Sequence, residues 1–174
     1  MKIAIIGNAG SGKSTLGLKL HKKLGIPLYH LDQYFWRPGW QEPERAEFER
    51  VHNQLCDQNE WIIEGMAQRF CEYRIQKADV IIFLDAPLYL CFYRIFKRAV
   101  THFGKVYFSS AKGCPERGPS LKFLKYVWNF NSQKKPALEQ LLQKYKNRKK
   151  IFIVKNWAKL NALIKNVNQA FFEK

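Results

Sequence analysis

A run of apolar residues opens the chain and leads into glycines, a lysine and hydroxyl side chains, in the segment KIAIIGNAGSGKSTLGLKL at residues 2–20. The first five of these residues predict a buried parallel strand. The residues that follow fit the pattern G-x-x-x-x-G-K-[ST], in which glycines let the backbone come close to anionic oxygens. Leucine spacing then predicts a helix over 13–24, ended by Gly25 and Pro27. The opening segment is therefore typical of a strand, a phosphate-binding loop and a helix.

Loop N–H groups and the N-terminus of helix 13–24 are expected to converge on the phosphates of ATP. Lys13 would reach the β- and γ-phosphates, and the Ser14 hydroxyl would bind Mg²⁺. The alternative is a glycine-rich turn without a ligand. The residues predicted to bind ATP are Gly7, Asn8, Ala9, Gly10, Ser11, Gly12, Lys13, Ser14 and Thr15.

With 174 residues and 47% hydrophobic side chains, the chain is expected to form one domain, residues 1–174, with a sizeable core. No apolar run approaches the length of a membrane span, so we expect no membrane partner. Met1 leads straight into a predicted strand, which predicts no signal peptide. Four scattered cysteines without a C-x-x-C pair favour free thiols over a zinc site or disulfides, and hence a cytoplasmic protein.

Positive charge is concentrated in the second half of the chain. Residues 1–93 contain eleven Lys/Arg and eleven Asp/Glu, whereas residues 94–174 contain nineteen Lys/Arg and three Asp/Glu. This favours polyanionic ligands such as nucleotides, with nucleic acid as a further possibility. The alternative is a lysine-rich solvated surface, especially for KYKNRKK at 144–150.

Strand-like and helical segments alternate along the chain, which predicts an α/β fold with a parallel sheet and helices on both faces. The predicted strands are Lys2–Ile6, Pro27–His30, Trp61–Ile63, Val80–Leu84 and Ile151–Val154. The predicted helices are 13–24, 43–58, 68–76, 87–101, 120–130, 135–147 and 157–172. Residues 102–119, rich in Gly, Pro and Ser, predict a loop or lid. Ligands bind at the carboxyl ends of parallel strands, so residues after each strand are the site candidates.

Acidic residues follow three of the predicted strands. Asp32 is predicted to orient an acceptor hydroxyl, act as a base, or hold Mg²⁺ through water, with a helix cap or turn as the alternative. Glu64 and Asp85 both follow apolar strands and are both candidates for the Mg²⁺ site. Asp85 has a further interpretation as the cap of a helix that begins near Pro87.

Arginines are the remaining site candidates. Arg94 and Arg98 share a helix face, and with Arg117 they would clamp the phosphoryl group in flight; the alternative is a solvated basic edge. Arg69 and Arg74 would hold an anion of the acceptor, or form surface ion pairs with acids such as Glu72 and Asp79.

An aromatic cluster lies beside Arg37, where an acceptor would dock. It would either stack a base or form a small core under helix 43–58. Its members are Tyr34, Phe35, Trp36 and Trp40.

The chain resembles the DNA topology modulation proteins, adenylate-kinase-like P-loop NTPases, in the segments GNAGSGKST, YHLDQYFWRPGW, WIIEG, ADVIIFLDAPLYLCFYRIFKR and GCPERGPSLKFLKYVWNF. The resemblance implies a three-layer P-loop NTPase fold with strand order 2-3-1-4-5 and a short lid. It places Arg94 and Arg98 on the lid helix, Arg117 in the lid, and Asn156 beside the adenine. Glu64 stands where aspartate is usual in this family, and Met66 and Ala67 replace a polar pair.

Our main hypothesis is a small kinase that uses ATP and Mg²⁺ to phosphorylate a nucleoside, a nucleoside monophosphate or another small hydroxylated acceptor. The alternative is a nucleic-acid-binding regulator of DNA topology that uses ATP as a switch. A third hypothesis is a nucleotide-binding remnant with slow ATPase activity. A monomer and a homodimer are both compatible with the sequence.

Overall fold

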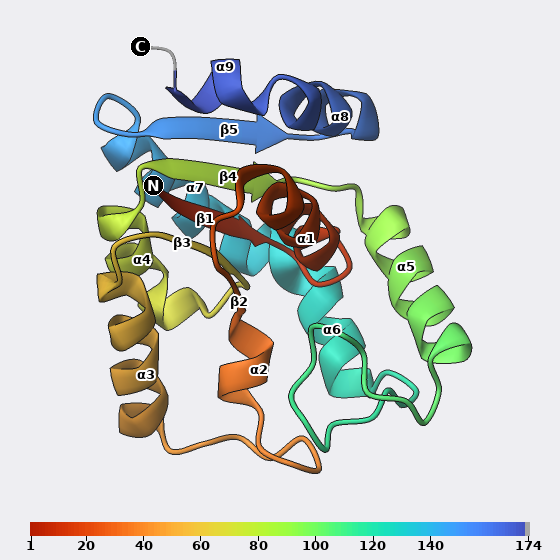
Figure 1. Ribbon diagram of the computed structural model, residues 1–174. Coiled ribbons are helices and arrows are strands. Elements are labelled where there is room, and N and C mark those ends of the chain that lie inside the picture. The colour runs from red at the N-terminus through yellow and green to blue at the C-terminus, as the bar shows by residue number, and fades with distance from the viewer. Residues whose placement is uncertain (173–174) are drawn as a thin grey trace.

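The computed structural model describes residues 1–172, whose strands form one five-stranded parallel sheet in the order β2-β3-β1-β4-β5 (Figure 1). The predicted strand order is therefore confirmed. The strands are β1 Lys2–Gly7, β2 Leu28–His30, β3 Trp61–Glu64, β4 Val80–Leu84 and β5 Lys150–Val154.

Helices cover both faces of the sheet, which confirms the three-layer fold. The helices are α1 Lys13–Leu24, α2 Leu31–Phe35, α3 Arg45–Asp57, α4 Cys71–Lys77, α5 Leu88–Thr101, α6 Leu121–Asn129, α7 Lys135–Tyr145, α8 Trp157–Lys165 and α9 Val167–Phe172. Because side chains alternate along a strand, Ala4 and Ile6 of β1 pack with α3, α4 and α7. Ile3 and Ile5 pack on the opposite face with α1, α8 and α9.

Several helices differ from those predicted. Helix α2 was not predicted, because five residues are too few to show a helical period. The segment predicted as helix 68–76 begins as a 3₁₀ turn, and the segment 157–172 is broken between α8 and α9. A π-helical stretch at Phe130–Lys134 joins α6 to α7.

The 102–119 segment contains no helix or strand and forms a loop that lies beside residues 36–41 (Figure 1). Gly39 N–H donates to Gly113 O at 2.8 Å, and the Trp40 indole N–H donates to Pro115 O at 2.9 Å. The Cys114 thiol lies 3.1 Å from Arg37 O. The two loops are therefore joined mainly through backbone carbonyl groups.

No helix within residues 1–172 is both long and apolar enough to cross a bilayer. The four cysteines are free and buried.

Candidate functional site

The phosphate-binding loop between β1 and α1 depends on glycines at three positions. Gly7, Gly10 and Gly12 have φ values of 147°, 74° and 102°, which side chains other than glycine rarely adopt. A Cβ on Gly10 would lie 2.4 Å from Cys91 O, and one on Gly7 would lie 2.5 Å from Leu84 O. The loop is therefore packed tightly against β4 and α5.

The N-terminus of α1 carries no capping side chain, because its cap residue is Gly12. Its first N–H groups are the donors that such a loop presents to a phosphate. The Lys13 ammonium donates to Asn8 O at 2.8 Å and so folds back over the loop. Burial lowers the pKa of Lys13, and the carboxylates of Glu64 and Asp32 oppose this effect.

Side-chain hydrogen bonds join the loop to two other helices, α6 and α5. The Asn8 amide donates to Val127 O of α6 at 2.9 Å, and its oxygen accepts from Ala9 N–H at 2.8 Å. The Arg94 guanidinium of α5 donates to Ser11 O at 2.8 Å and to Gly10 O at 3.4 Å. Arg94 thus contacts the loop backbone itself.

Glu64, at the end of β3, reaches the residue predicted to bind Mg²⁺. The Ser14 hydroxyl donates to Glu64 Oε1 at 2.9 Å. Oε1 also lies 2.6 Å from His30 Nδ1. Burial alone would raise the pKa of Glu64, but the hydrogen bond from His30 and the charge of Lys13 outweigh it and hold the pKa below its usual range.

His30 is a residue that our sequence reasoning did not select. It is buried, and β2 pairs with β3 in a register that places His30 directly beside Glu64. Its ring also packs edge-on against Phe108 of the 102–119 segment, with centroids 5.5 Å apart. The parallel pairing of the two predicted strands was the available signal for this contact.

Asp32 lies in the first turn of α2, whose cap residue is His30, so its interpretation as a helix cap is wrong. By surface area, Asp32 is an exposed residue. Protein nevertheless surrounds it closely enough that lost hydration, and then the charge of Glu64, raise its pKa to about 6. Lys13 and Arg98 act on the same carboxylate in the opposite direction. Asp32, Lys13 and Glu64 therefore lie close enough together for their charges to affect the pKa values of Lys13 and Asp32.

Asp85, the other Mg²⁺ candidate, is held by a different partner. The Lys135 ammonium contacts its two carboxylate oxygens at 2.8 and 2.9 Å. Helix α5 has Pro87 as its cap residue and no side-chain cap, so the capping interpretation of Asp85 is also wrong. Of the two acids, Glu64 is the one that contacts Ser14.

The three arginines predicted to clamp the phosphoryl group have separate contacts in this structure. Arg98 Nε lies 3.0 Å from Glu116 Oε1, and the Arg98 guanidinium lies 5.3 Å from the Tyr107 ring centre. Arg117 lies over the Trp40 ring at 5.8 Å, while Arg94 contacts the loop. Arg98 and its carboxylate partner therefore link α5 to the 102–119 segment.

The acceptor arginines also have different environments. Arg37 pairs with Glu47 at the surface, and Arg69 is exposed. Arg74 is fully buried and donates to Gly65 O at 2.8 Å and Met66 O at 3.2 Å. The structure thus contradicts both the expectation that Arg74 presents its charge to an acceptor and the surface ion pairs considered for it.

Arg74 instead supports the turn that follows Glu64. This turn is conformationally unusual, because Gly65 has φ 137° and Ala67 has φ 32°. Arg74 Nε and Nη1 have no hydrogen-bond partner within the described residues. The charge of Arg74 was visible in the sequence, but its burial was not.

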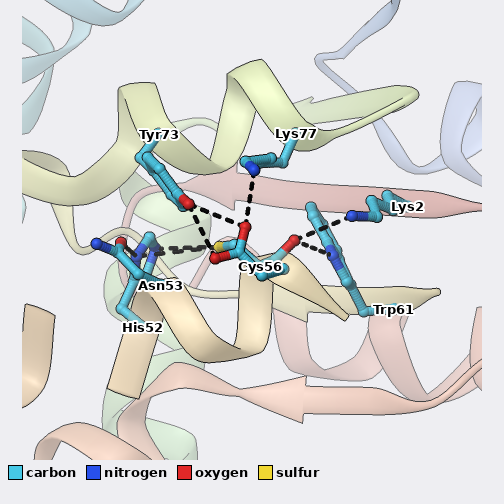
Figure 2. A network of polar contacts seen from close by, with 8 residues as sticks. Lys2, His52, Asn53, Cys56, Trp61, Tyr73 and Lys77 are labelled. Carbon is cyan, nitrogen blue, oxygen red and sulfur yellow. Dashed lines mark hydrogen bonds and ion pairs between the residues drawn. The ribbon is translucent and has the colours of Figure 1, made fainter. Parts of the chain in front are cut away.

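A network of polar contacts ties the end of α3 to the sheet (Figure 2). Cys56 O accepts from Lys2 Nζ at 3.1 Å and from the Trp61 indole N–H at 3.0 Å. Lys77 pairs with Asp57, which joins α4 to α3. These contacts fix the strand that ends in Glu64.

The predicted aromatic cluster extends from a core into the 36–41 loop, because Phe35 packs edge-on against Trp36 with centroids 4.9 Å apart. Phe35 packs edge-on against Phe48 of α3, with centroids 4.9 Å apart, and so belongs to a core. Trp36 and Trp40 pack on each other in the 36–41 loop.

Asn156, predicted beside the adenine, is the cap of α8. Its side-chain oxygen accepts from Lys159 N–H at 2.9 Å.

Neither a protein-family model nor a curated protein sequence matches this chain. Solved structures do match, including shikimate kinase from Acinetobacter baumannii in complex with shikimate. The TM-score is 0.63 at 17% identity, over 97% of this chain and 90% of that chain. Deoxyadenosine kinase from M. mycoides matches with a TM-score of 0.53 at 18% identity, over 97% of both chains.

A putative kinase from Chloroflexus aurantiacus matches with a TM-score of 0.55 at 16% identity, over 97% of both chains. At these identities the similarity establishes the fold alone, which this chain shares with shikimate kinase and deoxyadenosine kinase. The resemblance to the DNA topology modulation proteins stays a prediction.

Proposed function

We propose that this protein is a Mg²⁺-dependent kinase that transfers the γ-phosphoryl group of ATP to a hydroxyl of a small acceptor. The observation that carries the proposal is the 2.9 Å contact between Ser14 and Glu64, beside Lys13 and within the electrostatic reach of Asp32. The phosphate-binding loop, the carboxylate proposed for the metal and the candidate base thus all lie at the carboxyl ends of the strands.

The donor set fits ATP and Mg²⁺. Loop N–H groups and the uncapped α1 terminus are suited to phosphate oxygens, and Lys13 adds a cation. Ser14 Oγ would bind Mg²⁺ directly, and Glu64 would hold it through water. The metal would neutralise charge that develops on the phosphates.

The chain's own residues divide the remaining work. Asp32 orients the acceptor hydroxyl and accepts its proton, for which a raised pKa is suitable at neutral pH. The charge of Arg98 lowers the pKa of both Lys13 and Asp32. Arg98 is therefore the arginine best placed to stabilise the transferring group. Arg94 holds the loop through its backbone carbonyls, and Arg117 lies over the Trp40 ring in the 36–41 loop.

For the acceptor, we propose a nucleoside or nucleoside monophosphate, with Arg37 and Arg69 at the entrance. The similar structures include a kinase with bound shikimate and a deoxyadenosine kinase, so small hydroxylated compounds of both kinds belong in the first assay. Four free cysteines support a location in the cytoplasm.

The test measures ADP release from ATP and Mg²⁺ with a panel of nucleosides, nucleoside monophosphates and hydroxylated acids. Lys13→Ala should abolish acceptor-dependent turnover, while Lys22→Ala, at an exposed position on the same helix, should leave it unchanged. An acceptor that raises turnover at least a hundredfold over water would support the proposal. Tight ATP binding with no active acceptor would contradict it and favour the nucleic-acid-binding alternative.

A further inference from the structure

Exposed apolar side chains are concentrated on one part of the molecule. Of the eleven large hydrophobic residues that are exposed among the described residues, nine lie between residues 89 and 128. Four of them belong to α5: Tyr89, Tyr93, Phe96 and Val100 are 76%, 59%, 47% and 79% exposed. We refer to these four residues as the α5 stripe.

The α5 stripe has the spacing of a helix-packing surface. Its positions follow the series i, i+4, i+7 and i+11, the alternation of three and four residues found in coiled-coil seams. The opposite side of α5 already packs inward through Cys91, Ile95 and Ala99. In Figure 1, α5 forms one margin of the molecule, with no other element beyond it. One apolar side of this helix therefore has no partner within the described chain.

We propose that a second copy of this chain covers the α5 stripe, through antiparallel packing of α5 against α5. A twofold axis near the middle of the helix would bring Tyr93 of one copy against Phe96 of the other, and Tyr89 against Val100. The inference goes beyond the proposed function, since it concerns assembly and not the phosphoryl acceptor.

The exposed apolar area approaches that of a standard interface. Phe103 is 70% exposed at the end of α5, and Trp128, 66% exposed, lies 6.2 Å from the Phe92 ring. Covering the stripe and these two side chains would remove on the order of 700 Å² per copy, since an aromatic residue buries about 150–250 Å². A standard interface uses about 800 Å² per partner.

Charge on the stripe favours a second copy over a polyanion. The stripe contains no charged residue, and Arg94 and Arg98 of the same helix are directed to Ser11 O and Glu116. Lys97 of the same helix lies 5.8 Å from the Tyr93 ring centre. Nucleic-acid surfaces instead interleave cations with aromatic side chains to reach successive phosphates.

Dimerisation would also stiffen the helix that holds the phosphate-binding loop. Arg94 and the backbone of Cys91 both contact the loop from α5. Packing a second α5 against the outer side would hold this helix between two apolar surfaces. The two phosphate-binding loops of the dimer would then be supported by one shared helix pair.

Analytical ultracentrifugation of the full chain over a range of concentrations tests the proposal. We expect a dimer at micromolar concentration, and at least a hundredfold weaker association for Tyr93→Glu. Val100→Glu, at a more exposed position, should have the same effect, so that loss of folding in one variant does not decide the result. Ile153→Glu, on the exposed part of β5, is the matched control and should remain a dimer with an unchanged circular dichroism spectrum.

Salt dependence separates this interface from the competing partners. Each copy has a net charge of +16, so added salt should strengthen dimerisation by screening repulsion. Binding to nucleic acid or anionic lipid should instead weaken with salt. A wild-type monomer at 100 µM would overturn the proposal, as would a dimer that survives Tyr93→Glu. A wild-type monomer that binds single-stranded DNA or phosphatidylserine vesicles through the stripe would also overturn it.

Discussion

The two sides of the candidate site are held together in different ways. On the ATP side, the loop is fixed by Asn8, Arg94 and close glycine contacts, and the Glu64 carboxylate meets Ser14 at 2.9 Å. On the acceptor side, the 36–41 loop and the 102–119 segment meet mainly through hydrogen bonds to backbone carbonyls. Buried contacts that involve charged groups hold the first side in place. The second side is held by hydrogen bonds that each contribute little free energy.

This difference explains where changes should act. Removing one partner of a buried charge pair, or disrupting close backbone packing, strongly destabilises the folded protein. A single exposed hydrogen bond contributes about 1 kcal/mol. Substitutions on the ATP side should therefore abolish activity, whereas those on the acceptor side should tune the affinity for the acceptor.

The largest effect is expected for Glu64→Gln. A neutral amide keeps the shape of the side chain but lacks the charge to hold Mg²⁺ through water, so kcat/KM should fall at least a thousandfold. Steady-state ADP release at several Mg²⁺ concentrations measures this loss.

Asp85→Asn is the matched control, because Asp85 pairs with Lys135. It should lower the free energy of unfolding by about 1–3 kcal/mol and change activity less than threefold. If Asp85→Asn shows the larger loss of activity, the metal belongs to Asp85 and not to Glu64.

Asp32→Asn should have the next largest effect, a loss in kcat/KM of at least a hundredfold, because the variant cannot accept the acceptor proton. In the wild type, protonation inactivates this base. Since the pKa of Asp32 is raised to about 6, activity should rise with pH through that value. A kcat/KM profile from pH 5 to 8 measures the rise.

The rise should disappear in Asp32→Asn and persist in Glu42→Gln, an exposed acid remote from these contacts. An unchanged profile in Asp32→Asn would assign the base to another residue.

Local and long-range features differ in how well the sequence predicts them. The loop from β1 to α1 was predictable because its strand, glycines and helix are adjacent in the chain. The choice between Glu64 and Asp85 was not, since it depends on Lys135, fifty positions beyond Asp85. Because Arg74 is charged, the sequence indicates a surface position. Its burial follows only from how α4 packs against the turn at Gly65.

His52 of α3 makes the stability of the folded protein sensitive to pH. The side chain is fully buried among the rings of Phe48, Phe70 and Tyr73. Burial, aided by the charge of Arg74, lowers the pKa of His52 to about 4. The folded protein therefore keeps this residue neutral where the unfolded chain, with a pKa near 6.5, binds a proton.

Stability from His52 is complete above pH 6.5 and is lost as pH falls toward 4. Between pH 7 and pH 4.5 the free energy of unfolding should fall by about 2 kcal/mol through this residue alone. Urea unfolding of the wild type and His52→Gln at both values measures the difference. Equal pH dependence in the two proteins would show that His52 does not titrate in this way.

The smallest effect is expected for Trp40→Phe on the acceptor side. This variant removes the indole N–H bond to Pro115 O but keeps an aromatic ring beside Trp36 and Arg117. Because one exposed hydrogen bond is worth about 1 kcal/mol, the KM for the acceptor should rise two- to fivefold while the KM for ATP stays constant. Trp128→Phe, on α6, is the control and should change neither value. A rise in the KM for ATP alone would mean that the 36–41 loop and the 102–119 segment together shape the ATP side, and the division of the site into two independently held sides would be wrong.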